Sequence, residues 1–270
     1  MSGVRVTICE LPHDPVPLEA AWRSLCEHVE RERSDLVLLP ELAMVEPLWE
    51  RASFDPMRWA AAERLGERCL ERLGELKARF VVGTRASSEH GRHFNEGFLW
   101  SAKGGVVPLR RKFFLPDEPG GWEAQWFDRG DKEFPVFRVD ELSFGLNVCT
   151  ELWALETYSA YAALGVQMIL SPRATSAETT RKWISAGVVA AVRSGAYSVS
   201  SNRVDPSGAC GGVGWIIDPE GKVVARTAAD VPFYTAELDL DLARTARGGY
   251  PRYVFAECPT MMAKEISSRP

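Results

Sequence analysis

The chain has 270 residues, of which 46% are hydrophobic and 26% charged, proportions typical of a soluble globular protein. This length accommodates one large α/β domain or two small ones. The formal net charge of −5 argues against nucleic acid as a partner, because phosphate binding usually needs a basic surface. No segment reaches the roughly 18 consecutive apolar residues of a membrane helix. The first residues enter a strand-like run directly, so we expect no signal peptide, no membrane contact and a cytoplasmic location.

Alternating apolar and amphipathic segments predict an α/β fold. Strands are expected over residues 4–9, 36–39, 80–83, 136–139, 144–149, 168–170 and 196–200, with helices near 18–29, 59–76, 156–164 and 182–194. Hairpin signals predict antiparallel strands around a turn at 103–105 and over 214–217, 222–226 and 235–238. No linker or change of composition interrupts the chain. We therefore expect one domain over residues 1–270, with a core of about 4–255 and a tail of 256–270.

The cysteines are widely spread and include no C-x-x-C pair, so we interpret them as reduced thiols. They are Cys9, Cys26, Cys69, Cys149, Cys210 and Cys258. Most cysteines in such a chain are small buried hydrophobic residues. The four histidines do not follow strand ends, and neither residue type shows the spacing of metal ligands.

Cys149 differs from the other cysteines in its position, because a mostly apolar strand ends there and a helical pattern begins soon afterwards. A thiol at such a junction faces the positive end of the helix dipole, which favours the thiolate. The backbone N–H of Thr150 is placed to hold a developing oxyanion. The alternative is a buried structural cysteine.

Two charged residues occupy positions suited to assist a nucleophile. Glu41 directly follows the buried strand at 36–39, where a rigid scaffold can hold a functional side chain. Its alternative is a solvated loop glutamate. Lys112 lies among apolar neighbours, where it could donate to an oxyanion or lower a thiol pKa. Its alternative is a surface lysine on an edge strand.

Together these three segments resemble the nitrilase superfamily of carbon–nitrogen hydrolases. The resemblance is carried by Leu39-Pro40-Glu41, Arg111-Lys112-Phe113-Phe114-Leu115-Pro116 and Val148-Cys149-Thr150-Glu151, in the family's order and at similar intervals. It extends from about residue 6 to residue 253. It implies a Glu41–Lys112–Cys149 triad and a four-layer α-β-β-α sandwich with two mixed β-sheets.

The segment after Lys112 resembles the N-carbamoylputrescine amidase and β-ureidopropionase branch, in which a second glutamate orients the lysine and the substrate. By position this residue is Glu123, with Glu118 as its rival. The resemblance implies hydrolysis of an amide or N-carbamoyl bond of a small molecule through a thioester on Cys149, with Glu41 as general base. It implies no cofactor and no metal. A nitrilase acting on a C≡N bond and an inactive binding module of the same fold are the alternatives.

We expect four residues near the nucleophile to bind the substrate, namely Thr150, Glu151, Trp153 and Arg173. Arg173 follows an apolar strand, and many relatives have no arginine at that position. A guanidinium there could clamp a substrate carboxylate through two parallel hydrogen bonds, which predicts an acidic substrate. The alternative is a structural pair between Arg173 and Glu151 or Glu156.

The resemblance also implies a homodimer or a higher homo-oligomer. The helix that follows Cys149 is the candidate interface element, through Tyr158, Tyr161, Ala162 and Leu164. Packing of this helix into the core of one chain would explain the same apolar residues.

Overall fold

The computed structural model describes residues 3–256, and the strands in this range lie on one hydrogen-bonded path that divides into two mixed sheets. The first sheet has the order β12-β1-β2-β3-β4-β5, and the second has the order β6-β7-β8-β9-β10-β11. The two sheets meet where Glu10 and Leu11 pair in parallel with Asn202 and Arg203. The first sheet contains β1 (Gly3–Leu11), β2 (Leu36–Leu38), β3 (Phe80–Glu89), β4 (Arg92–Ser101), β5 (Gly105–Arg111) and β12 (Phe233–Asp239). The second contains β6 (Val136–Val139), β7 (Leu142–Leu146), β8 (Met168–Arg173), β9 (Tyr197–Arg203), β10 (Trp215–Ile217) and β11 (Val223–Arg226).

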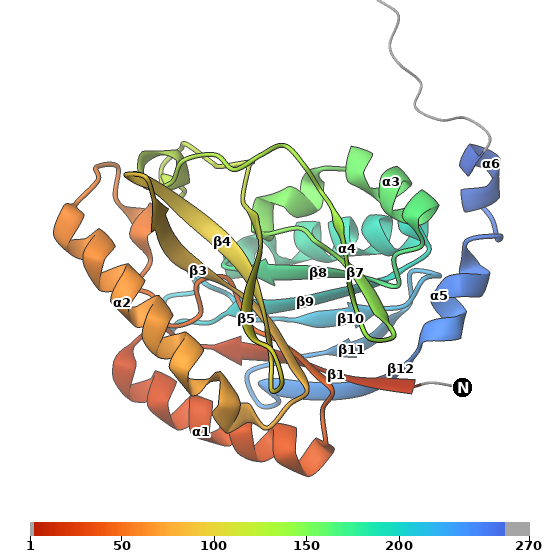
Figure 1. Ribbon diagram of the computed structural model, residues 1–270, viewed down its shortest axis with the longest axis horizontal. Coiled ribbons are helices and arrows are strands. Elements are labelled where there is room, and N and C mark those ends of the chain that lie inside the picture. Colours follow the sequence, from red (N-terminus) through yellow and green to blue (C-terminus); the bar gives the residue numbers. More distant parts are fainter. Residues whose placement is uncertain (1–2, 257–270) are drawn as a thin grey trace, which may run out of the picture.

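Helices cover the outer face of each sheet, which gives the predicted four layers (Figure 1). The first sheet is covered by α1 (Pro15–Glu32) and α2 (Pro56–Arg72), and the second by α3 (Glu156–Leu164) and α4 (Thr180–Ser194). Two short helices, α5 (Leu240–Ala246) and α6 (Arg252–Ala256), follow β12. Single 3₁₀ turns occupy Leu48–Glu50, Leu73–Leu76, Glu123–Gln125, Cys149–Trp153 and Ala177–Thr179.

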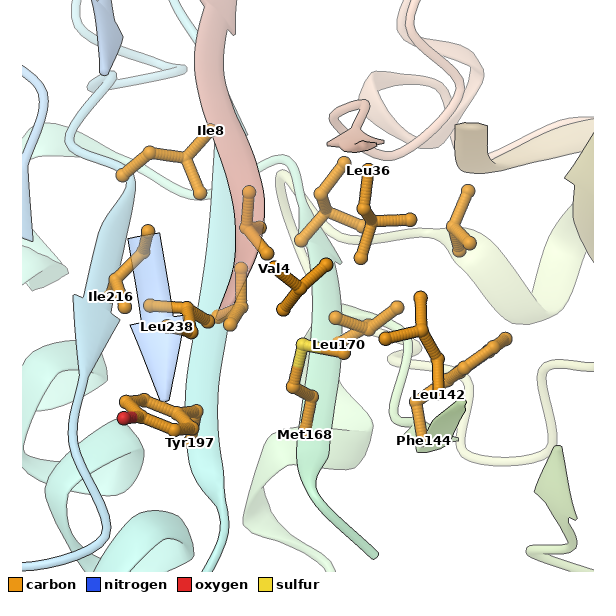
Figure 2. Close-up of a cluster of buried hydrophobic side chains, with 14 of the residues drawn as sticks. Val4, Ile8, Leu36, Leu142, Phe144, Met168, Leu170, Tyr197, Ile216 and Leu238 are labelled. Atoms are coloured by element: carbon orange, nitrogen blue, oxygen red, sulfur yellow. The ribbon is translucent and has the colours of Figure 1, made fainter. Parts of the chain in front are cut away.

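The space between the sheets is filled by apolar side chains from both of them (Figure 2). Val4 and Ile8 of β1 point inward because successive side chains of a strand alternate between its faces. They pack in one cluster with Leu170 of β8 and Ile216 of β10. Cys149 belongs to the same buried cluster, so the candidate nucleophile packs against the inter-sheet core.

The sequence-based expectation of an α-β-β-α sandwich with mixed sheets is confirmed, and the helix expected at 156–164 has those bounds. The helices α5 and α6 were not expected. Asp239 caps the N-terminus of α5, since its side chain accepts a hydrogen bond from the backbone N–H of Asp241. The single domain over residues 1–270 stays a prediction. The predicted tail, 256–270, lies almost entirely outside the described residues.

The interface prediction for α3 needs correction at Tyr158 and Tyr161, and stays a prediction for Ala162 and Leu164. Tyr158 and Tyr161 are fully buried within the chain, on the side of α3 that faces the second sheet, so they are unavailable to a partner. Their spacing of three residues places both on one face of the helix. Leu164 is 53% exposed. The homodimer itself stays a prediction, as does the cytoplasmic location. No helix among residues 3–256 has the length and apolar character needed to cross a membrane.

A glycine permits the close approach of β7 to α3. A Cβ atom at Gly145 would overlap the ring of Tyr161, and the Tyr161 hydroxyl in turn donates to the Asn147 side chain, two residues before Cys149. We therefore expect Gly145→Ala to lower the free energy of unfolding by about 1–3 kcal/mol through overpacking. Urea titration measures this. Gly248→Ala, at an exposed position with room for a methyl group, should change stability by less than about 0.5 kcal/mol. Equal stability of both variants would contradict the packing described.

Candidate active site

Three charged side chains that are distant in the sequence meet at one point. The Lys112 Nζ atom donates to Glu41 Oε1 at 2.9 Å and to Glu123 Oε1 and Oε2 at 2.8 and 2.6 Å. Glu41 follows β2, Lys112 follows β5, and Glu123 begins the 3₁₀ turn Glu123–Gln125. Glu118, the rival for the second carboxylate, is exposed on the same loop. The structure therefore brings Glu123, and not Glu118, to Lys112.

Lys112 is completely buried, and Glu41 and Glu123 are 2% and 7% exposed. Burial disfavours the ammonium form, but the negative charges of Glu123 and Glu41 outweigh that cost, so the pKa of Lys112 is raised. Burial also raises the pKa of Glu123 to about 7, against the opposing effect of Lys112. Lys112 thus remains a cation, while Glu123 changes its charge near neutral pH.

Cys149 lies three residues beyond the end of β7 with a φ of 48°, in the left-handed region that non-glycine residues rarely occupy. Such a conformation costs about 1–3 kcal/mol and persists where the surroundings enforce it. Burial and the nearby Glu41 raise the pKa of the Cys149 thiol, in spite of Lys112 and of a hydrogen bond from the Ala174 backbone N–H. The expected thiolate is therefore not favoured. Cys149 begins a 3₁₀ turn of only five residues, and the predicted helix, α3, starts at Glu156.

The Glu41 loop is held by contacts from both sheets. The Glu41 backbone N–H donates to Arg173 O at 3.2 Å, and the Leu42 N–H donates to Thr84 Oγ1 at 2.9 Å. The buried Arg203 guanidinium donates to the carbonyl oxygens of Leu42 and Val45. Leu42 also has a left-handed φ of 48°. The backbone on the C-terminal side of Glu41 is thus fixed by hydrogen bonds that do not involve its carboxylate.

Glu151 holds the lysine and cysteine segments together. Its carboxylate accepts hydrogen bonds from the backbone N–H groups of Val148 and Phe113, at 2.9 and 2.7 Å, and from both terminal nitrogens of Arg110. Val148 precedes Cys149 and Phe113 follows Lys112. Glu151 is fully buried, and these four donors occupy both of its oxygens. The expectation that Glu151 binds the substrate is therefore replaced by a structural role.

The other expected substrate-binding residues near Cys149 have different environments. Thr150 is partly buried, and its position directly after Cys149 is the one required of an oxyanion donor. Trp153 is 45% exposed, and its ring centroid lies 5.6 Å from that of Trp183 on α4. Contact of either residue with a substrate stays a prediction.

Arg173 contacts neither of its predicted carboxylate partners, since Glu151 is paired with Arg110 and Glu156 is exposed. Its three guanidinium nitrogens donate to neutral acceptors, which are Ser200 Oγ, Thr175 Oγ1 and Val213 O, at 2.7, 2.6 and 2.6 Å. The guanidinium also lies 4.0 Å from the Trp215 ring centroid. Burial lowers the pKa of Arg173 to about 9. These contacts favour an anchor for the end of β8, and the acidic-substrate hypothesis stays a prediction.

Sequence reasoning missed Asn95, which lies on β4 and donates from Nδ2 to Glu41 Oε1 at 2.8 Å. It also missed Arg110, the partner of Glu151. The sequence offered one indication of Asn95, which is an amide side chain within a strand whose neighbouring Phe94 and Phe98 are apolar. Among residues 3–256, no group of three or more His, Cys, Asp or Glu side chains is arranged to hold a metal ion.

The family model for carbon-nitrogen hydrolases matches residues 5–248. The chain belongs to this family. The carbon-nitrogen hydrolase model covers the Glu41, Lys112, Glu123 and Cys149 segments together, as well as both sheets.

Individual proteins of known name are more distantly similar to this carbon-nitrogen hydrolase. N-carbamoylputrescine amidase from Solanum lycopersicum is 26% identical over 179 residues, which is 60% of each chain. The match thus spans about 60% of that relative's length. The crystal structure of a carbon-nitrogen hydrolase from Helicobacter pylori G27 has a TM-score of 0.82 at 19% identity, covering 94% of this chain and 95% of that one. A mutant of an amidase from Nesterenkonia sp. AN1, with acrylamide added at its active-site cysteine, has a TM-score of 0.70 at 19% identity, covering 91% of this chain and 97% of that one. These structural matches show a shared fold.

The buried pair of Arg110 and Glu151 yields a stability prediction for this carbon-nitrogen hydrolase. Glu151→Gln leaves the Arg110 charge buried without its carboxylate, so we expect a loss of about 3–5 kcal/mol in the free energy of unfolding. Adding Arg110→Met should cost less than the sum of the two single changes, since the variants share one interaction. The control is Glu89→Gln, which breaks a more exposed pair with Arg111 and should cost less than about 1 kcal/mol. Additive effects of the two changes in the buried pair would contradict the coupling.

Proposed function

We propose that this chain is an amidohydrolase that cleaves a non-peptide C–N bond, an amide or an N-carbamoyl bond, with Cys149 as nucleophile. The observation that carries the proposal is the buried Lys112 ammonium between Glu41 and Glu123, close enough to Cys149 that the charges of all three groups act on the pKa of its thiol. The names of two similar proteins, an N-carbamoylputrescine amidase and an amidase modified at its active-site cysteine, support this choice of reaction.

Glu41 is the proposed general base. Its Oε1 atom already accepts hydrogen bonds from Lys112 and Asn95, whereas no donor to Oε2 is found among residues 3–256. Oε2 is therefore available for the thiol proton. Because the pKa of Cys149 is raised, the resting nucleophile is the neutral thiol and attack requires this base. The proton moves to Glu41 as the sulfur bonds to the substrate carbonyl carbon.

Lys112 and the Thr150 backbone N–H are the proposed donors to the oxyanion of the tetrahedral intermediate. The C–N bond then breaks, and the leaving nitrogen takes the proton from Glu41, so that ammonia or an amine departs and a thioester remains on Cys149. Water attacks this thioester with Glu41 again accepting a proton, which passes to the sulfur. The acid product leaves, and thiol and carboxylate are restored.

A substrate screen tests the reaction class. Ammonia or amine release is measured with N-carbamoyl amino acids, N-carbamoyl amines, ω-amides and nitriles. We expect turnover of at least one amide or carbamoyl class, and none by Cys149→Ala or Cys149→Ser of unchanged fold. Turnover of nitriles alone would replace the proposal with a nitrilase, and activity retained in Cys149→Ala would remove the nucleophile assignment.

A labelling experiment separates Cys149 from the other thiols. An electrophile that carries an amide, such as acrylamide, should modify Cys149 first. The proposed site binds the amide, and it supplies a base that can deprotonate the buried thiol. Cys26 is the matched control, since it is more exposed and has a raised pKa of about 11. Cys26→Ser should leave inactivation unchanged. Inactivation that follows modification of Cys9 or Cys258 would contradict the assignment; Cys258 lies outside the described residues.

The raised pKa of Glu123 predicts a pH dependence. Glu123 loses its proton as the pH rises through about 7, and the ionised form strengthens its hold on Lys112. We expect kcat/KM to rise with pH, with an apparent pKa near 7. Glu123→Gln should remove this rising limb of the pH profile. It should also lower kcat/KM about 10- to 100-fold at pH 8.5, as expected for a lost charged hydrogen bond. Glu118→Gln, at an exposed site, should keep the limb. A limb near pH 7 that persists in Glu123→Gln would assign the titration to another group.

A further inference from the structure

Asn95 is a buried amide in contact with the base and next to the lysine. It is 1% exposed; its Nδ2 atom donates to Glu41 Oε1 at 2.8 Å, and its backbone carbonyl accepts from the Lys112 N–H at 2.9 Å. Its Oδ1 atom is buried and has no hydrogen-bond partner among the described residues. The side chain therefore contributes one satisfied donor and one unsatisfied acceptor beside the candidate catalytic groups.

The orientation of this amide follows from its neighbour. The Glu41 carboxylate only accepts hydrogen bonds when ionised, so the Asn95 NH₂ group must face it and the oxygen must face away. The oxygen is nevertheless near the Glu41 carboxylate, because Oδ1 and Nδ2 are bonded to the same carbon atom and Nδ2 lies 2.8 Å from Glu41 Oε1. Buried acceptors without partners are uncommon, because they lose their bonds to water without compensation. An unpaired oxygen at this point favours a donor that arrives with the substrate.

We propose that Asn95 Oδ1 accepts a hydrogen bond from an N–H of the scissile amide or carbamoyl nitrogen, and so makes the site selective for amides over esters. The inference rests on the proposed amidohydrolase function and adds the group that recognises the leaving nitrogen. It places that nitrogen beside Glu41, the group that must protonate it as the C–N bond breaks. An ester presents an oxygen lone pair at the same position, and a nitrile presents no N–H. A site built to bond an N–H discriminates strongly against analogues that lack it.

Asn95 also orients Glu41, and the experiment must separate the two roles. Loss of the bond to Glu41 affects every substrate, whereas loss of the Oδ1 acceptor affects only substrates that carry an N–H. We therefore compare a primary amide and the methyl ester with the same acyl group, for wild type and Asn95→Ala. The expected result is that Asn95→Ala lowers kcat/KM for both and lowers the amide-to-ester ratio by a further factor of about ten. An unchanged ratio would overturn the inference.

Two further variants exclude loss of structure as the explanation. Asn95→Asp keeps the size and one acceptor oxygen, so it should reduce both activities but retain the amide preference. Ser171→Ala removes another buried oxygen without a partner, on β8, and should leave the amide-to-ester ratio unchanged. If Ser171→Ala lowers the ratio as much as Asn95→Ala, recognition by Asn95 is excluded.

A binding measurement makes the result independent of ester turnover. In a Cys149→Ala background, the amide should bind more tightly than the ester, and the added Asn95→Ala change should abolish most of that difference. Equal affinities with Asn95 present would overturn the inference. If the wild type hydrolyses no amide or carbamoyl compound and none binds, the proposed function itself fails. If amides are hydrolysed but Asn95→Ala leaves the preference intact, only the role of Asn95 fails.

Discussion

The structure depends on keeping one ammonium group entirely out of water. A lysine with no exposed surface would lose its proton unless negative charge were supplied nearby, and Glu41 and Glu123 supply it at 2.6–2.9 Å. The same contact fixes Oε1 of Glu41 and leaves Oε2 for another partner. Lys112 thus holds the proposed base in place, and the same charge is the proposed donor to the oxyanion. Neutralising it would leave two carboxylates facing each other in a medium of low polarity.

Several non-glycine residues have a left-handed backbone, and two of them carry or adjoin the groups of the candidate site. Cys149 and Leu42 both have left-handed φ angles, and each is enclosed by hydrogen bonds that do not involve its own side chain. Around Cys149 these bonds end on Glu151, and around Leu42 they end on Thr84 and Arg203. The surrounding network, and not the local preference of the residue, determines the conformation. Glu151 is therefore as important to the geometry as the residues it holds.

The fold class and the segments bearing Glu41, Lys112 and Cys149 could be predicted from the sequence, because periodicity and motif order are local properties. The partners of Glu151 could not, since Arg110 lies 41 residues away and only the folded chain brings the two together. The direction of the Cys149 pKa shift could not be predicted either, for a related reason. A helix dipole can be anticipated from a pattern of residues, but the extent of burial that opposes it depends on the completed core. The same applies to Tyr158 and Tyr161, whose apolar pattern is equally typical of an interface and of a core.

The candidate site is divided between the two sheets. Glu41, Asn95 and Lys112 belong to the first sheet or its loops, whereas Cys149 follows β7 of the second. The thiol therefore meets the ammonium–carboxylate contacts only where the two sheets pack together, and residues of the second sheet also hold the backbone of Glu41 and its neighbour Leu42. A chain in which one sheet has formed before the other carries a base without a nucleophile, or a nucleophile without a base. The proposed reaction therefore requires the closed sandwich, because only the packed sheets bring the base and the nucleophile together.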